Sequence, residues 1–114
     1  MAYIDIVPVS GRVVVRWRGH AVVDTENALE LREGAYPPVL YLPREDADMA
    51  LLTPSPHHTT CPHKGVASYF SLAAEGAGDD NAVWCYETPK AEVAAIAGRL
   101  AFYVDKVEIS RNPS

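Results

Sequence analysis

The chain has 114 residues, of which 48% are hydrophobic and 22% are charged, a composition typical of one globular domain rather than of a disordered chain. Its net charge of -5 and pI near 5.2 argue against non-specific nucleic-acid binding, which needs a field of lysine and arginine. No apolar run approaches the ~20 residues of a membrane span, and because the first residues include Asp5 and Pro8 we do not expect a secretory signal there. We therefore expect a single cytoplasmic domain, 1–114, with an ordered core over roughly 10–110, that binds neither nucleic acid nor membrane.

Short strands dominate the first part of the chain. Residues 12–18 and 21–24 are rich in β-branched side chains, and the Gly19-His20 pair between them suits the type II′ turn of a β-hairpin. Residues 28–31 alternate apolar with polar side chains, and 39–42 form an apolar run that a proline ends. Both segments are predicted strands, and a capped helical turn is the alternative for 28–31.

The middle of the chain is predicted to hold a short helix and a polar loop. Ala47, Ala50 and Leu51 have helical spacing, so a helix is expected over 46–52, and the prolines that follow would end it. The polar stretch His57–Gly65 would then be a loop. Because loops held over a rigid scaffold often carry function, we expect any chemistry to lie there.

The second half combines a hairpin with a longer helix. Residues 66–72 alternate between two faces, and the turn-rich segment 76–81 leads into a returning strand over 82–86. Thr88-Pro89 is a suitable cap and first turn for a helix that would end near Gly98.

Two further strands, 100–104 and 106–109, are predicted near the end of the chain, while the first few residues and the tail 111–114 are expected to be loose. The strands follow one another in hairpins and do not alternate with long helices. The sequence therefore predicts a mainly β (α+β) fold, in which one or two short helices cover an antiparallel sheet.

Several segments, in order along the chain, carry a resemblance to a known family. They are Tyr41-Leu-Pro-Arg-Glu-Asp46, Thr60-Cys-Pro-His-Lys-Gly65 with Ala67-Ser-Tyr69, Val83-Trp84 with Tyr86 and Pro89, and Ile96-Ala-Gly98 with Ala101-Phe-Tyr103. Over roughly residues 13–107 the chain resembles the domain-of-unknown-function family four-two-seven. The resemblance implies a bent, tent-like β-structure of the Mss-four-like kind. It also implies a nucleotidyltransferase label, which some catalogues give that family.

Nucleotidyl transfer would need paired carboxylates that hold two divalent metals, and Asp46 and Asp48 have the residue types for a Mg²⁺ site. Their spacing is unfavourable, because residues two apart point to nearly opposite sides of a helix. The other interpretation is that Glu45, Asp46 and Asp48 are acids of a helical first turn, where the dipole favours them.

A zinc site is the second possibility. His57, His58, Cys61, His63 and Cys85 are all ligand types, but only His58 and Cys61 have a spacing seen in structural zinc sites. Nothing in the sequence therefore requires a metal ion or another cofactor. Whether the protein uses a cofactor is not determined by the sequence. The two cysteines are expected to be free thiols.

A thiol nucleophile is the third possibility. Cys61 would lie on the polar loop with His58 or His63 near enough to accept its proton. An inert cysteine is the commoner outcome for such a residue.

A pocket for an anionic or polar small molecule is the interpretation we favour. Lys64 supplies a point charge, Arg44 a planar fork, and Gly65 a backbone that a ligand can approach closely. The alternative is that both cations pair with surface acids while the aromatic residues form core. The candidate catalytic residues are Cys61, His58 and Lys64, and the candidate ligand-binding residues are Arg44, Asp46, Thr60, Gly65, Tyr69, Trp84 and Tyr86.

The rival hypothesis from another class is a protein-interaction module, which includes a homodimer. It predicts an apolar surface patch around Trp17, Tyr36 or Tyr103 and no concave pocket near Lys64.

Overall fold

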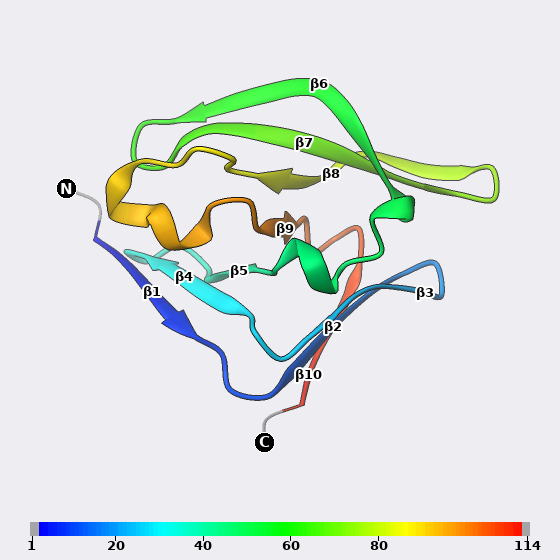
Figure 1. Ribbon diagram of the computed structural model, residues 1–114, viewed down its shortest axis with the longest axis horizontal. Helices are drawn as coiled ribbons and strands as arrows, with labels where there is room; N and C mark the ends of the chain where they lie inside the picture. Colours follow the sequence, from blue (N-terminus) through cyan, green and yellow to red (C-terminus); the bar gives the residue numbers. More distant parts are fainter. Residues whose placement is uncertain (1–2, 113–114) are drawn as a thin grey trace.

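The structure, a computed structural model, describes residues 3–112 and consists mainly of antiparallel β-strands (Figure 1). The strands are β1 (Ile4–Pro8), β2 (Arg12–Trp17), β3 (His20–Thr25), β4 (Leu29–Glu33), β5 (Val39–Tyr41), β6 (Leu52–Cys61), β7 (Gly65–Ala74), β8 (Ala77–Cys85), β9 (Leu100–Phe102) and β10 (Glu108–Asn112). The helical elements are three short 3₁₀ helices, η1 (Arg44–Asp46), η2 (Met49–Leu51) and η3 (Ala91–Ile96). The predicted mainly β fold is confirmed.

Three sheets, ordered β1-β4-β5, β10-β2-β3 and β6-β7-β8-β9, make up the fold. The first two meet at a corner where β1 runs into β2 and β3 into β4, opposite the four-stranded sheet (Figure 1). At that corner Val9 N–H still donates to Ala28 O at 3.0 Å. The first two sheets are therefore the two halves of one bent antiparallel structure, as the tent-like expectation implied.

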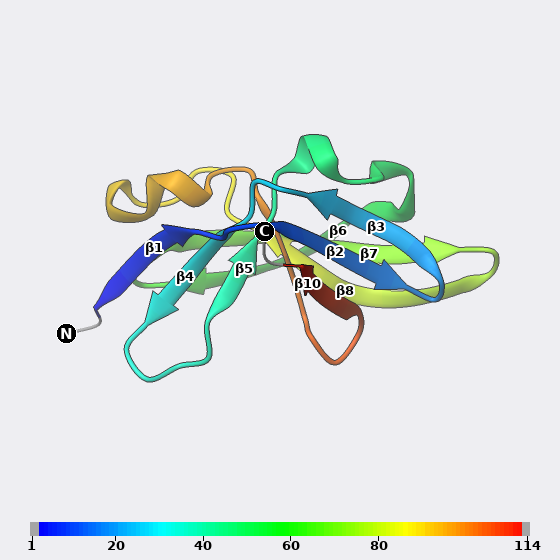
Figure 2. The same ribbon diagram turned by 90° about the horizontal axis from the view of Figure 1, so that it is seen from below.

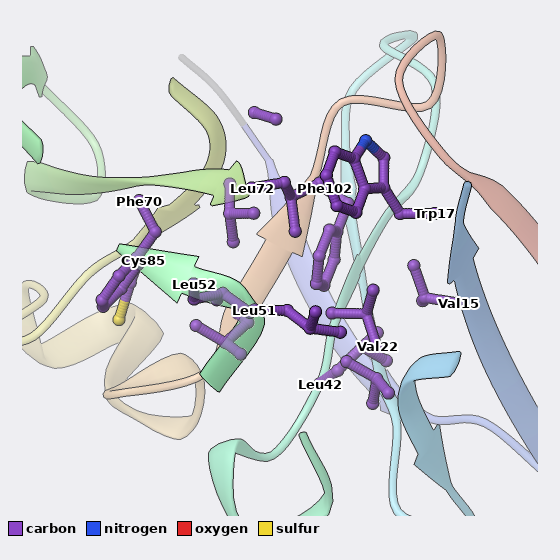
Figure 3. Close-up of a cluster of buried hydrophobic side chains, with 14 of the residues drawn as sticks. Val15, Trp17, Val22, Leu42, Leu51, Leu52, Phe70, Leu72, Cys85 and Phe102 are labelled. Carbon is purple, nitrogen blue, oxygen red and sulfur yellow. The ribbon is translucent and has the colours of Figure 1, made fainter. Parts of the chain in front are cut away.

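The corner and the four-stranded sheet enclose two apolar clusters. The first cluster contains Val15, Trp17 and Leu72, and it fills the space between the β10-β2-β3 sheet and the four-stranded sheet (Figure 3). The second cluster is formed by Leu31, Tyr41, Ala67, Tyr69, Tyr86, Val93, Ile96 and Ala101. It lies at the other end, between β4-β5 and the same four-stranded sheet.

Strand β7 contributes to both clusters. Its residues alternate as predicted, with Phe70 and Leu72 in the first cluster and Ala67 and Tyr69 in the second. Because successive side chains of a strand point to opposite faces, β7 is covered on both faces.

The polar loop predicted over 57–65 is largely strand. β6 continues to Cys61 and includes Pro54 and Pro56, because it is the outermost strand of its sheet and pairs only with β7. A proline is tolerated on an edge strand, where it removes no ladder hydrogen bond. The register shifts between Ser55 and His58, so the bulge accommodates the second proline.

The two predicted helices are shorter than expected and have 3₁₀ geometry. The helix over 46–52 is replaced by η1 and η2, and the helix expected from Thr88 begins only after Lys90. In η3 the buried side chains are Val93 and Ile96, three residues apart. Val93 has non-helical backbone angles (φ -124°, ψ 26°), so η3 consists of two short turns joined at a kink and is not one continuous helix.

Strands also form nearer both ends than the sequence pattern predicts. β1 starts at Ile4 and pairs with β4, while Arg111 and Asn112 of the supposedly loose tail pair with β2. Strand β1 and the residues Arg111 and Asn112 lie outside the expected ordered range of roughly 10–110. The remaining residues of the two ends, 1–2 and 113–114, are outside the described part of the chain. Among residues 3–112, no helix is long and apolar enough to cross a membrane.

The first two sheets and the four-stranded sheet are joined through Leu42 and Leu100, whose backbones exchange two hydrogen bonds of 2.8 Å each. Both side chains are fully buried. We expect Leu42→Ala to lower the free energy of unfolding by about 2–5 kcal/mol in urea denaturation, because it opens a cavity at this junction. The matched Val66→Ala, at a side chain that is 52% exposed, should change it by less than about 0.5 kcal/mol. Equal effects of the two substitutions would contradict this assignment.

Candidate functional site

A pocket of about 280 Å³ opens between the β4-β5 hairpin and the four-stranded sheet. It is lined by Leu31, Glu33, Tyr36, Pro37, Val39, Tyr41, Lys64, Tyr69, Trp84, Tyr86 and Tyr103. Five of the six tyrosines of the chain are in this set. We refer to it as the tyrosine pocket.

An ion pair lies in the wall of the tyrosine pocket. Lys64, in the turn between β6 and β7, donates from Nζ to Glu33 Oε1 at 2.7 Å. The two side chains are only 12% and 15% exposed. Burial by itself lowers the pKa of Lys64, but the hydrogen bond to Glu33 and nearby groups outweigh burial and raise that pKa above its usual value. Lys64 therefore stays charged at neutral pH.

The aromatic side chains hold one another in place. Trp84 Nε1 donates to the Tyr41 hydroxyl at 3.3 Å, and the rings of Trp84 and Tyr103 lie 4.7 Å apart between centroids. The Tyr69 hydroxyl is 2.9 Å from Thr59 Oγ1 on the edge strand. These contacts connect β5 to β8 and β6 to β7, so the walls are set by the packing of the strands.

The tyrosine hydroxyls are kept neutral. Burial raises the pKa of Tyr41 to about 12 and also raises that of Tyr86. The hydroxyl of Tyr69, together with burial, raises the pKa of Tyr103 to about 12. At neutral pH these groups donate and accept hydrogen bonds, and they do not serve as anionic bases.

Four of the predicted site residues come together in the tyrosine pocket: Lys64, Tyr69, Trp84 and Tyr86. Cys61 is half-buried and packs against the second apolar cluster, whose members Tyr69 and Tyr86 line the pocket. The roles assigned to these residues stay predictions.

Arg44 does not face the tyrosine pocket, so the expectation that it shares one hollow with Lys64 is wrong. Its Nη2 donates to Glu87 Oε2 at 2.8 Å and to Cys85 Sγ at 3.0 Å. Cys85 lies between Trp84 and Tyr86, and adjacent strand residues point to opposite faces. A guanidinium bonded to Cys85 therefore lies on the far face of β8 from the aromatic wall.

Cys85 is buried and its thiol stays protonated. Burial, followed by the nearby Glu87 carboxylate, raises the pKa of Cys85 to about 11, although Arg44 acts in the opposite direction. Both cysteines are free in the structure.

Three further candidates lie away from the tyrosine pocket. His58 and Thr60 are exposed on β6, and Asp46 accepts a hydrogen bond from Thr25 Oγ1 at 2.7 Å. Gly65 has a φ of +116°, and a Cβ there would lie 3.6 Å from Thr88 O. The backbone of Gly65 is therefore approached closely by another part of the chain, and not by a ligand as the sequence led us to expect.

The acids that the sequence analysis weighed as metal ligands make hydrogen bonds to nearby parts of the chain. Asp48 Oδ1 accepts from Ala50 N–H at 3.2 Å, so Asp46 and Asp48 both serve local structure. Within residues 3–112 no three histidine, cysteine, aspartate or glutamate side chains gather closely enough to hold a metal ion.

The sequence analysis missed Glu33, Tyr36, Tyr41 and Tyr103. A signal existed for two of them, because β-alternation places Glu33 on the face of Leu31 and Tyr41 on the face of Val39. Locating that face required knowing that β4 and β5 pair, with Leu31 opposite Val39.

A family model described as "Domain of unknown function (DUF427)" matches residues 5–112. This chain belongs to the DUF427 family. The resemblance expected from the sequence is confirmed, and the model's short label, NTP_transf_9, carries the nucleotidyltransferase term.

No curated protein matches this DUF427 domain. The family description assigns no function. Any functional assignment for this DUF427 domain therefore depends on the residues of its pocket.

The buried hydroxyl of Tyr41 should make this DUF427 domain less stable as the pH rises in the alkaline range. Its pKa is raised from 10.0 to about 12. Because the native state holds the proton more tightly than the unfolded chain, this contribution is complete below pH ~10 and is lost as the pH rises through ~12. It is on the order of 2–3 kcal/mol.

Urea denaturation between pH ~9 and ~12 tests this dependence. Tyr41→Phe should flatten the fall in unfolding free energy relative to wild type, since one titrating group is removed. Tyr36→Phe, at a side chain that is 74% exposed, is the control. Parallel curves for wild type and Tyr41→Phe would show that Tyr41 does not titrate in this way.

Proposed function

We propose that this domain binds a small, planar, polar molecule in the tyrosine pocket. The observation that carries the proposal is the Lys64–Glu33 ion pair, held at 2.7 Å in the wall of a pocket otherwise rich in aromatic rings. Small-molecule sites are typically concave and aromatic, with a few polar groups that fix orientation.

The ion pair favours a ligand with a hydrogen-bond acceptor beside a donor. Lys64 has three N–H groups, and in the described residues Glu33 takes one of them through its side chain. The Glu33 carboxylate has accepting capacity beyond Lys64. A carboxamide edge, or the matching edge of a heteroaromatic ring, would accept from the ammonium and donate to the carboxylate.

The walls favour a flat ring. Tyr69, Trp84, Tyr86 and Tyr103 line the pocket with aromatic rings, and each of the three tyrosines has a hydroxyl group at the end of its ring. At about 280 Å³ the pocket is at the lower end of the range for ligand sites, so one or two rings suit it better than a larger molecule.

A neutral head group fits better than a simple anion. The charge of Lys64 is balanced by Glu33, and Arg44, the second expected cation, is paired with Glu87 elsewhere. An anion would have to lie beside a carboxylate that is only 15% exposed. Of the anionic or polar ligand expected from the sequence, the polar kind is therefore the one we propose.

We assign no reaction to the pocket. The raised pKa values of Tyr41, Tyr86 and Tyr103 keep these three hydroxyls neutral, and the lysine is held in the charged form by a carboxylate. His58, a predicted catalytic residue, lies exposed on β6, where Nδ1 is 2.9 Å from Pro56 O. Binding is the activity that these groups support.

Benzamide is a suitable first probe, since it joins a flat ring to a carboxamide. In a titration followed by NMR, benzamide should perturb the backbone amides of Glu33, Lys64 and Trp84. Lys64→Gln should weaken binding at least about tenfold, the value of one hydrogen bond to a charged group. The control Lys106→Gln changes an exposed lysine outside the pocket and should leave binding unchanged. Absence of benzamide perturbations at the pocket would overturn the proposal for this head group.

Glu33→Gln provides a test that keeps the shape of the pocket. Glutamine can still accept from Lys64, but the carboxylate charge is gone, so the pocket gains net positive charge. We expect benzoate to bind more tightly to this variant than to wild type, and benzamide to lose its advantage over benzoate. Glu92→Gln, at an exposed residue of η3, is the matched control. An unchanged preference in Glu33→Gln would contradict a role for the ion pair in recognition.

A further inference from the structure

We infer that the natural ligand is amphipathic, with a polar head in the tyrosine pocket and an apolar tail in an adjoining groove. This inference rests on the proposed function and adds the chemical class of the ligand. It comes from a second hollow that the sequence analysis did not anticipate.

The second hollow, which we call the apolar groove, has a volume of about 440 Å³. Its walls include the buried side chains of Leu42 and Phe102 and the more exposed ones of Leu40, Val104 and Ile109. The β4-β5 loop and the loop between β9 and β10, which contribute to these walls, project on the same side of the molecule (Figure 2). The groove thus has apolar walls that face solvent.

The two hollows adjoin one another. Pro37, Val39, Trp84 and Tyr103 line both of them. Trp84 directs its Nε1 toward the Tyr41 hydroxyl in the tyrosine pocket, and its ring also borders the groove. These four residues form the boundary between the hollows, so a molecule with its head beside Lys64 would reach the groove by passing over them.

Exposed apolar side chains are concentrated at this place. Among the described residues the large exposed hydrophobic ones are Tyr3, Tyr36, Val66, Tyr103 and Val104. Three of them, Tyr36, Tyr103 and Val104, border the two hollows. Val104 is 77% exposed. Clustered apolar surface of this kind marks a binding site, and the polar pocket beside it indicates that one ligand covers both.

The length of the tail is limited by charges at one part of the groove. Glu30 and Arg111 line it, and Arg111 Nη1 donates to Glu30 Oε2 at 3.3 Å. Glu30 also accepts from Arg32 Nε at 2.8 Å. Methylene groups reaching this ion pair would desolvate charges and gain nothing, so affinity should level off beyond a certain chain length.

A series of para-alkyl benzamides tests the inference, because the head is constant and only the tail grows. Each added methylene that enters the groove should tighten binding roughly threefold to fourfold, until the tail reaches Glu30 and Arg111. In NMR titrations the longer members should perturb the amides of Leu40, Phe102 and Ile109 in addition to those that benzamide perturbs.

Val104→Glu places a charge in the groove at an exposed position that is not part of the tyrosine pocket. It should abolish most of the gain from the tail, so that long-chain and short-chain amides bind this variant with similar affinity. Val66→Glu introduces the same charge at another exposed valine, outside both hollows, and should leave the gain intact.

The outcomes separate this inference from the proposed function. If benzamide binds at Lys64 but affinity does not rise with chain length, the amphipathic ligand is wrong and the polar pocket stands. If no member of the series binds, both are wrong. Sedimentation of the ligand-free protein tests the other occupant of the groove: a dimer that Val104→Glu dissociates would mean that a second copy fills the groove, which overturns the inference.

Discussion

The pair of backbone hydrogen bonds between Leu42 and Leu100 is the constraint on which the arrangement of this domain depends. It joins the bent sheet to the four-stranded sheet, deep in the molecule where both side chains are excluded from water. Leu42 and Leu100 point into the first apolar cluster, while their neighbours Tyr41 and Ala101 belong to the second. The alternation of two short strands thus divides the interior into two clusters, and the tyrosine pocket opens beside the second one.

The Lys64–Glu33 ion pair is a second connection between the bent sheet and the four-stranded sheet. Glu33 ends β4 in one sheet, and Lys64 lies in the turn at the far end of β6, in the other. Largely desolvated ion pairs give little net stability, because the cost of removing two charges from water offsets their attraction. The pair therefore adds little to the stability of the fold, and in the function that we propose it recognises a ligand.

The features that could be predicted from the sequence are those determined by neighbouring residues, whereas contacts between distant parts of the chain could not be predicted. The hairpin of β2 and β3 and the alternation of β7 are local and were predicted, but the two turn residues are Arg18 and Gly19, both with positive φ, and not Gly19 and His20 as expected. Arg44 was misplaced because its position depends on η1, which delivers the side chain to the Cys85 face of β8. Glu33 was missed because its partner is contributed by a different sheet. The composition of the site therefore depends on side-chain contacts between different sheets, and no local sequence pattern encodes these contacts.

Trp84 lies at the boundary between the tyrosine pocket and the apolar groove, and its side chain lines both hollows. Its indole N–H is committed to the Tyr41 hydroxyl, so the ring cannot rotate without losing a partly buried hydrogen bond. The ring packs 4.7 Å from that of Tyr103, and both rings border the tyrosine pocket and the apolar groove. Because one rigid pair of rings forms the boundary, the two hollows keep a fixed spacing. The amphipathic ligand that we infer would place its polar head on one side of this boundary and its apolar tail on the other.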